Sequence, residues 1–276
     1  MKLALWQCRP TDGRVEEALV ALEARVEAAA AAGAGLLVVP ELYLPGYNRP
    51  DLHASAAQPL DGAWITRVRD LARRAECGVC LGWAERDGDE LYNAATLVGP
   101  DGTVRIHYRK VQLFGGMEAR SFRRGTRLAP VVEVAGRHVG LLVCYDIEFP
   151  GHAASLAAAG ADLILVPTAN PAGYEHVQRT LVPARAYEND AVVAYANLVG
   201  TERELTFGGL SLVAGPDGLP LAAAGARGEA LLVVDLDAAD AVPDEVRSEL
   251  AREYRPVGRD DGPAAPRPPR RRPDPD

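Results

Sequence analysis

The segment Val139-Gly-Leu-Leu-Val-Cys144-Tyr-Asp-Ile-Glu148-Phe-Pro150 carries the strongest signal in the chain. An apolar run leads to a single cysteine, and an acidic, aromatic turn closed by Pro150 follows at once. A continuous apolar run of this length is typical of a buried strand. A thiol at the end of such a strand is presented at the edge of a sheet, where a nucleophile meets its substrate.

Short apolar segments alternate with amphipathic, alanine-rich segments along the rest of the chain. Some apolar runs are continuous, and others follow hairpin-like turns, which indicates two mixed sheets covered by helices, an α/β sandwich. The predicted helices are 14–32, 64–76, 151–159 and 174–189. The predicted strands are 3–7, 35–39, 78–85, 91–98, 103–107, 131–134, 138–143, 162–167, 191–196, 209–213 and 230–234.

The composition is that of an ordinary globular domain. Of 276 residues, 48% are apolar and 25% are charged, and α/β folds of this length often form one domain. We therefore expect residues 1–255 to fold as a single domain. Residues 256–276 are rich in proline and arginine and have no apolar face to bury, so a disordered tail is predicted there.

The charge and the cysteine content narrow the cellular setting. A net charge of −8 disfavours nucleic acid and anionic membranes as partners. Residues 1–7 are too short for a secretion signal, and no apolar run reaches the length of a membrane span. The four cysteines are more typical of free thiols than of a disulfide framework. We expect a cytoplasmic protein that acts on a small molecule.

Three reactive side chains follow predicted strands or begin loops: Glu41, Lys110 and Cys144. A thiol is mostly protonated at neutral pH and needs a base or a cation to become a nucleophile. We expect Glu41 to take the proton, and Lys110 to favour the thiolate and then the oxyanion of a tetrahedral intermediate, with the Tyr145 N–H as a second donor. Only Lys2 and Lys110 are lysine among 30 basic residues, which indicates that a compact ammonium is needed at position 110.

Each of these three residues alone has an ordinary structural explanation, as a buried small hydrophobe, a polar turn or a solvated charge. Their conjunction favours nucleophilic acyl transfer. Cys77 and Cys80 have the Cys-x-x-Cys spacing, but a second pair is missing, so no metal or redox site is predicted. A Cys–His pair with His152 is the weaker alternative, because Glu41 already supplies a base. No nucleotide-binding motif is present, and we predict no cofactor.

An ordered series of motifs resembles the nitrilase superfamily, the carbon–nitrogen hydrolases. The resemblance runs from residue 1 to about residue 235. The motifs that carry it are Val39-Pro-Glu41, Leu44-Pro-Gly-Tyr-Asn48, Tyr108-Arg-Lys110, Leu113-Phe-Gly115, Cys144-Tyr-Asp-Ile-Glu-Phe-Pro150, Leu165-Val-Pro-Thr-Ala-Asn170, Arg185-Ala-Tyr-Glu-Asn189, Tyr195-Ala-Asn197 and Gly215-Pro-Asp-Gly218.

The resemblance implies a four-layer αββα sandwich and a homodimer or higher homo-oligomer formed through the helical faces. It implies that Glu41, Lys110 and Cys144 form a catalytic triad. It also implies a second glutamate in the loop after the lysine, a place that Glu118 occupies. This residue would orient the substrate or the lysine.

Within the superfamily, the turn after the cysteine is similar to that of amidases, among them 5-aminopentanamidase and stereoselective amino-amide amidases. The resemblance implies a cofactor-free enzyme that hydrolyses a small amide, ω-amino or amino-acid amides included, to a carboxylic acid and ammonia through a thioester. Tyr43, Tyr145 and Asn170 would line the amide pocket. Asp146 and Glu148 have two readings: with Glu118 they face a distal ammonium of the substrate, or they satisfy backbone donors or pair with arginine.

Two alternatives to the amidase remain. One is a nitrilase or N-carbamoyl hydrolase with the same triad, and the other is a non-catalytic scaffold that binds partners through the arginine-rich tail. The intact triad disfavours the scaffold. Arg124, Gly151 and Ala154 stand where relatives commonly carry proline, glutamate and arginine, which bears on substrate choice and interface detail.

Overall fold

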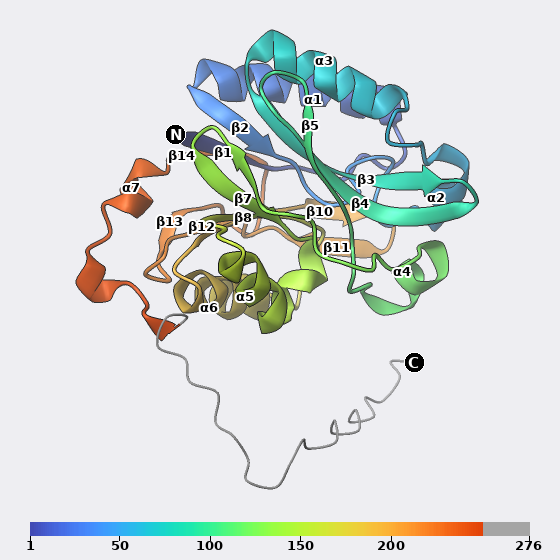
Figure 1. The fold of residues 1–276 in the computed structure, drawn as a ribbon. Helices are drawn as coiled ribbons and strands as arrows, with labels where there is room; N and C mark the ends of the chain where they lie inside the picture. Colours follow the sequence, from blue (N-terminus) through green and yellow to red (C-terminus); the bar gives the residue numbers. More distant parts are fainter. Residues whose placement is uncertain (251–276) are drawn as a thin grey trace, which may run out of the picture.

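A computed structural model describes residues 1–250, and the predicted tail lies outside the described residues. Two β-sheets stack face to face in the middle of the molecule, with one layer of helices above and one below (Figure 1). This is the αββα sandwich that the sequence predicts. Within residues 1–250, no helix combines the length and the apolar character needed to cross a bilayer.

The first sheet has the strand order β14-β1-β2-β3-β4-β5. Its central strands β1, β2 and β3 are parallel, whereas β14, β4 and β5 pair antiparallel with their neighbours. The strands are β1 (Lys2–Gln7), β2 (Ala34–Val38), β3 (Gly78–Asp87), β4 (Glu90–Val98), β5 (Val104–Arg109) and β14 (Ala230–Asp235).

The second sheet has the order β13-β12-β9-β8-β7-β6 and the same plan, with parallel strands β7, β8 and β9 at its centre. A separate antiparallel hairpin, β10–β11, follows β9. The strands are β6 (Val132–Val134), β7 (Arg137–Leu141), β8 (Leu163–Thr168), β9 (Val192–Asn197), β10 (Val199–Glu202), β11 (Leu205–Gly208), β12 (Leu212–Ala214) and β13 (Pro220–Ala223).

Helices α1 and α3 cover the first sheet, and α5 and α6 cover the second (Figure 1). Each of the two longest helices buries a stripe with helical spacing, in α3 Trp64, Ile65, Val68, Leu71 and Ala72. The helices are α1 (Val15–Ala31), α2 (Pro50–Ala56), α3 (Ala63–Ala75), α4 (Gly115–Ser121), α5 (Pro150–Ala158), α6 (Val182–Glu188) and α7 (Asp237–Asp240).

Alternation along β1 divides the interior into two cores. Leu3 and Leu5 face the second sheet, whereas Ala4 and Trp6 face the helices of the first layer. Because both faces of the strand are covered, the interior of β1, residues 3–6, is apolar without alternation.

The helix predicted over 174–189 is the largest departure from expectation. A π-helical turn, Val177–Leu181, precedes α6, and the Val182 N–H bonds to the Val177 carbonyl. Pro183 has no N–H for the carbonyl four residues earlier, so the regular α-helical pattern cannot run through it. The prediction also omitted the β10–β11 hairpin and α4, whose polar or glycine-rich sequences show little periodicity.

The parallel strands bring their carboxyl ends to one edge of the sandwich. β2 and β5 run in the same direction in the first sheet, so the loops that follow them leave from the same edge. The Glu41 N–H donates to the Thr168 carbonyl at the end of β8, 3.3 Å away, which ties that edge to the second sheet. The loop after β2 therefore lies between the sheets.

Gly82 in β3 allows this loop to lie close against the sheet. A Cβ atom at position 82 would lie 2.5 Å from the Pro40 carbonyl oxygen and 2.6 Å from the Cα of Glu41. Both neighbours are backbone atoms, which cannot swing away as a flexible side chain does. The absence of a side chain in β3 thus determines where Glu41 lies.

We predict that Gly82→Ala lowers both stability and activity. The methyl group must push the Pro40–Glu41 backbone outward, at a cost of about 1–3 kcal/mol in the free energy of unfolding. Urea unfolding and steady-state kinetics measure the two effects. Gly35→Ala in β2 is the matched control, since its Cβ would meet only the flexible Met1 side chain, at 3.8 Å. Equal unfolding midpoints for the two variants would contradict the prediction.

Candidate active site

Glu41 is a fully buried carboxylate between the two sheets. Its Oε1 accepts hydrogen bonds from Lys110 Nζ at 2.5 Å and from Asn93 Nδ2 at 2.7 Å. Its Oε2 is also buried and has no hydrogen-bond partner among residues 1–250. One oxygen is therefore anchored while the other is left to accept a proton.

Lys110 directly follows β5 and is completely buried. Its ammonium donates to Glu41 and, at 2.8 Å, to Glu118 Oε1. Burial alone would lower the pKa of Lys110, but the carboxylates of Glu118 and Glu41 outweigh it and raise the pKa, so the side chain stays charged. Neighbouring Arg109 lies outside this site, where it pairs with Glu85 at 2.7 Å. The two adjacent cations thus occupy different environments. The lysine, a rare residue in this chain, is the one inside the site.

Glu118 lies on α4 and is fully buried. Besides Lys110, the hydroxyl of Tyr47 donates to its Oε1 at 2.8 Å, and the Phe114 N–H donates to its Oε2 at 3.1 Å. These donors hold the carboxylate against the ammonium. The structure therefore brings Glu118 to the position beside Lys110 that the resemblance implies.

Cys144 begins a 3₁₀ turn, Cys144–Glu148, just beyond β7. Its φ is +47°, in the left-handed region that non-glycine residues seldom occupy and that clusters at functional sites. The residue is 6% exposed. A strained, nearly buried cysteine at a sharp strand-to-turn junction fits a nucleophile that the backbone presents to a small substrate.

Asp146 holds this turn against the segment that carries Lys110. Its carboxylate accepts hydrogen bonds from the Tyr108 hydroxyl at 2.9 Å, the Gln112 N–H at 2.8 Å and the Val143 N–H at 3.1 Å. Of the two readings of Asp146, the structure confirms the one in which it satisfies backbone donors. Arg185 supports the turn from the other side, donating to the carbonyl of Ile147 at 3.1 Å.

The site contains one ammonium and two carboxylates, which sets its protonation. Burial raises the pKa of Glu41 to about 7, although the Lys110 ammonium works in the opposite direction. Burial also raises the pKa of the Cys144 thiol, the Glu41 carboxylate adds to this, and the lowering effect of Lys110 is smaller. Cys144 is therefore a neutral thiol at rest, and a base must take its proton.

Tyr43, Tyr145 and Asn170, the residues expected to line the amide pocket, lie in three different surroundings. Tyr43 lies away from the triad: its hydroxyl donates to the Ala18 carbonyl of α1 at 2.8 Å, and its ring packs on Trp6. Tyr145 contacts Phe114 edge-on, with ring centroids 5.3 Å apart. The structure therefore contradicts the placement of Tyr43, because its ring belongs to the core under α1.

Asn170 is buried, and its side-chain amide is already engaged. Its Nδ2 donates to the Tyr174 carbonyl at 3.1 Å and to Gln178 Oε1 at 3.0 Å. Its backbone N–H donates to Asn197 Oδ1 at 2.7 Å. In this structure Asn170 orders the segment after β8, next to Ala169, whose backbone N–H works to lower the pKa of the Cys144 thiol.

Sequence reasoning did not single out Tyr47 and Asn93. Tyr47 stands in the motif Leu44-Pro-Gly-Tyr-Asn48, but Tyr43, four residues earlier, was expected to face the site. Asn93 lies within β4, where an amide among apolar neighbours was the only available signal. Its donation to Glu41 gives that polar residue a role inside an otherwise apolar strand.

A cavity of about 230 Å³ lies beside the start of α4, the helix that carries Glu118, and its lining does not include Glu41, Lys110 or Cys144. Its wall includes Tyr47 and Phe114, which both donate hydrogen bonds to Glu118, and Glu204, which contributes a carboxylate. Near Lys110, Arg124 donates to the Val111 carbonyl at 3.1 Å. The arginine that replaces the commonly found proline therefore braces the segment after the lysine.

The candidates set aside on sequence grounds stay outside the site. Cys77 and Cys80 are buried free thiols, and burial raises the pKa of Cys77 to about 11. The described part of the chain contains no cluster of side chains suited to a metal ion. His152 Nδ1 lies 3.8 Å from Asp146 Oδ1.

Comparison with known proteins agrees with this arrangement. A hydrolase encoded in the pqqF 5′ region of Pseudomonas protegens is 41% identical over 239 residues, covering 86% of this chain and 83% of that protein. An (R)-stereoselective amidase from a Pseudomonas species is 38% identical over 203 residues, 73% of each chain. Both similarities extend across most of the sandwich.

Solved structures show the same fold. An amidase from Nesterenkonia sp. AN1, in which acrylamide has added to the active-site cysteine, superposes with a TM-score of 0.80 at 37% identity, covering 89% of this chain and 98% of that one. The carbon–nitrogen hydrolase family matches residues 2–244. The chain belongs to the carbon–nitrogen hydrolases of the nitrilase superfamily, enzymes that act on non-peptide carbon–nitrogen bonds.

Proposed function

We propose that the protein is a cysteine-dependent amidase that hydrolyses a small amide to a carboxylic acid and ammonia. The observation that carries the proposal is the pairing of a neutral Cys144 thiol with Glu41, whose Oε2 is buried without a hydrogen-bond partner among the described residues. A carboxylate with a pKa near 7 is suited to take a proton and return it near neutral pH.

In the first half-reaction, Cys144 Sγ attacks the amide carbonyl carbon while its proton moves to Glu41. The charge that develops on the carbonyl oxygen requires donors. Two carboxylates accept hydrogen bonds from Lys110 Nζ, and an ammonium has three N–H groups, so the third can serve the oxyanion. The Tyr145 N–H, next to the nucleophile, is the second proposed donor.

The intermediate then collapses. The carbon–nitrogen bond breaks, Glu41 returns its proton to the leaving nitrogen, ammonia departs, and a thioester remains on Cys144. In the second half-reaction, Glu41 takes a proton from water as the oxygen attacks the thioester carbon. The thiolate leaves, recovers the proton from Glu41, and the carboxylic acid is released. Glu118 keeps the Lys110 ammonium in place throughout.

The proposed substrate class follows from the cavity beside α4. A volume of about 230 Å³ accommodates a short amide. The carboxylates of Glu118 and Asp146 already accept hydrogen bonds from within the protein, so neither binds a substrate ammonium in this proposal. Glu204 is a carboxylate in the cavity wall, and its negative charge suits an ω-amino amide. This preference would match the resemblance to 5-aminopentanamidase. We propose that Glu204 attracts a distal ammonium at the outer end of the cavity.

Other expectations from the sequence stay predictions. These are the homo-oligomer formed through the helical faces, the cytoplasmic location and the solvated tail at 256–276. The nitrilase and N-carbamoyl hydrolase alternatives share the triad. A nitrilase would release acid and ammonia from a nitrile, and an N-carbamoyl hydrolase would release carbon dioxide as well.

Ammonia release across a panel of short amides, nitriles and N-carbamoyl compounds tests the function. We expect acid and ammonia from amides, no carbon dioxide, and no product from Cys144→Ala. An ω-amino amide should exceed its uncharged isostere in kcat/KM, with a preference that shrinks as salt rises and disappears in Glu204→Gln. Turnover of nitriles alone would refute the amidase proposal, and equal specificity constants at low salt would refute the ω-amino preference.

Lys110→Arg should lower kcat by about a hundredfold or more, the scale of losing one oxyanion donor. The planar guanidinium keeps the charge but cannot place three donors around one nitrogen, and its bulk does not fit between Glu41 and Glu118. The other lysine of the chain supplies the control: Lys2→Arg changes an exposed residue and should leave kcat unchanged. Near-normal turnover in a folded Lys110→Arg variant would mean that the ammonium is not needed.

The pH dependence should reflect Glu41. The carboxylate is the active form, so kcat/KM for a neutral amide should be constant above its pKa and fall as pH drops through about 7. The acid form of Glu41 cannot take the thiol proton. Rates measured from pH 5 to pH 9 test this, with Glu41→Gln expected to be inactive throughout. An acid limb near the ordinary carboxyl value of 4.5 would assign the base elsewhere.

A further inference from the structure

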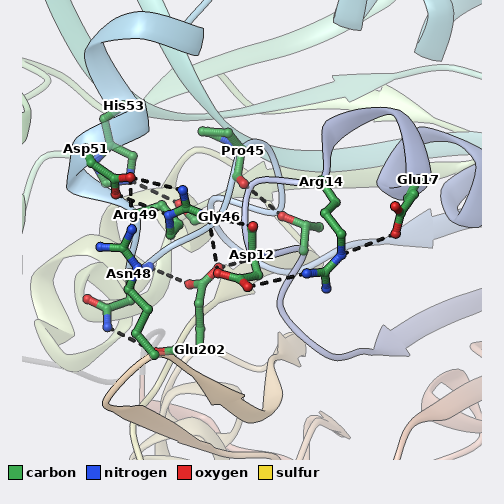
Figure 2. Close-up of polar contacts among 12 residues, drawn as sticks. Asp12, Arg14, Glu17, Pro45, Gly46, Asn48, Arg49, Asp51, His53 and Glu202 are labelled. Atoms are coloured by element: carbon green, nitrogen blue, oxygen red, sulfur yellow. Dashed lines mark hydrogen bonds and ion pairs between the residues drawn. The ribbon is translucent and has the colours of Figure 1, made fainter.

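Glu202, at the end of β10, is a buried carboxylate that no step of the proposed reaction uses. Its Oε1 accepts a hydrogen bond from the Asp12 N–H at 3.1 Å, and its Oε2 accepts one from the Asn48 N–H at 2.5 Å (Figure 2). Among residues 1–250 it forms no ion pair, and Arg49, on the loop that it binds, pairs with Asp12 and Asp51. The charge is held by backbone donors from two separate loops.

The chain leaves room for this carboxylate at Gly46. A Cβ atom there would lie 2.5 Å from Glu202 Oε1, and the φ of +136° is one that residues with side chains rarely adopt. Glycine is therefore required both by the backbone and by the approach of Glu202. On the opposite side, the Gly46 carbonyl lies 3.1 Å from Nε2 of the buried His53 (Figure 2).

Asn48 strengthens the same contact through its side chain. Its Nδ2 donates to the Glu202 carbonyl at 3.1 Å and to Glu204 Oε1 at 3.1 Å. Backbone and side chain together form three hydrogen bonds from one loop residue to the tip of the β10–β11 hairpin. The loop therefore cannot shift without breaking several of them.

The residue before Asn48 is Tyr47, whose hydroxyl donates to Glu118 at 2.8 Å. The hairpin contacts Tyr47 a second time, because Phe207 of β11 packs edge-on against its ring with centroids 5.8 Å apart. The backbone on one side of Tyr47 and its ring are thus both positioned by β10–β11. Any displacement of Tyr47 changes a hydrogen bond to the carboxylate that holds Lys110.

We propose that Glu202 is a positioning residue for the reaction: by binding the Asn48 backbone it keeps the Tyr47 hydroxyl on Glu118, and Glu118 in turn keeps the Lys110 ammonium in the site. The inference rests on the proposed role of the triad. Glu202 comes from the second half of the chain. It contacts neither the substrate nor the nucleophile, and it acts through Tyr47.

Both oxygens of Glu202 accept hydrogen bonds from N–H donors, so this position requires a side chain with two acceptor oxygens. Glutamine at this position supplies one acceptor and one NH₂ group, so an amide hydrogen must face a backbone N–H or one donor must go unsatisfied. Glu202→Gln therefore releases one of the two loops while nearly preserving side-chain volume.

A double-mutant cycle between Glu202→Gln and Tyr47→Phe tests the proposal. We expect each single variant to lower kcat by about tenfold, and the double variant to be no worse than about twofold below either one, because both changes remove the same hydrogen bond to Glu118. Thr201→Ala, an exposed change on the same hairpin, is the matched control and should keep the wild-type kcat. Multiplicative losses, near a hundredfold in the double variant, or no loss in Glu202→Gln would overturn the proposal.

The rate of Cys144 alkylation by iodoacetamide, followed by intact mass, gives a readout that does not depend on amide turnover. The same non-additivity is expected there, so an inactive wild-type enzyme would refute the amidase function while the cycle still decides the role of Glu202. If Glu202→Gln fails to fold, Glu202→Asp replaces it in the cycle, since the shorter carboxylate cannot reach both the Asp12 and the Asn48 N–H. Additive rates in that cycle would equally overturn the proposal.

Discussion

The buried Lys110 ammonium, shared by Glu41 and Glu118, is the interaction on which the rest of the site depends. A cation removed from water is costly unless paired, and two carboxylates around one ammonium leave an excess negative charge. Burial raises the pKa of Glu41 even though the Lys110 ammonium lowers it, and burial together with the Glu41 carboxylate raises the pKa of the Cys144 thiol. Burial of these groups therefore gives Glu41 the pKa of a base that works near neutral pH, and it leaves Cys144 as a thiol that needs such a base.

The sandwich makes this arrangement possible because it brings the ends of two sheets together. Glu41 comes from the first sheet and Cys144 from the second, and the Glu41 N–H binds the end of β8. Small residues and backbone donors, rather than flexible side chains, set these positions. Gly82 admits the Glu41 backbone, and Asp146 binds the Cys144 turn to the Lys110 segment.

Support for the site extends outward in two directions. Arg185 donates to the carbonyls of the nucleophile turn, while the β10–β11 hairpin holds the loop that carries Tyr47. In both cases a buried charge is satisfied largely by backbone groups. Such contacts define position sharply, because a buried charge that loses its partners is strongly destabilising.

The sequence by itself predicted the layered fold, the family and the residues of the candidate triad, because the apolar strands before Glu41 and Cys144 and the motif around Lys110 are local patterns. The resemblance to the family also implied Glu118, which lies 2.8 Å from Lys110 Nζ in the structure. Only the tertiary structure decided between Tyr43 and Tyr47. Which of them faces the site depends on the path of their loop, and that path is held by Glu202, 154 residues beyond Asn48. No local pattern contains a contact of that separation.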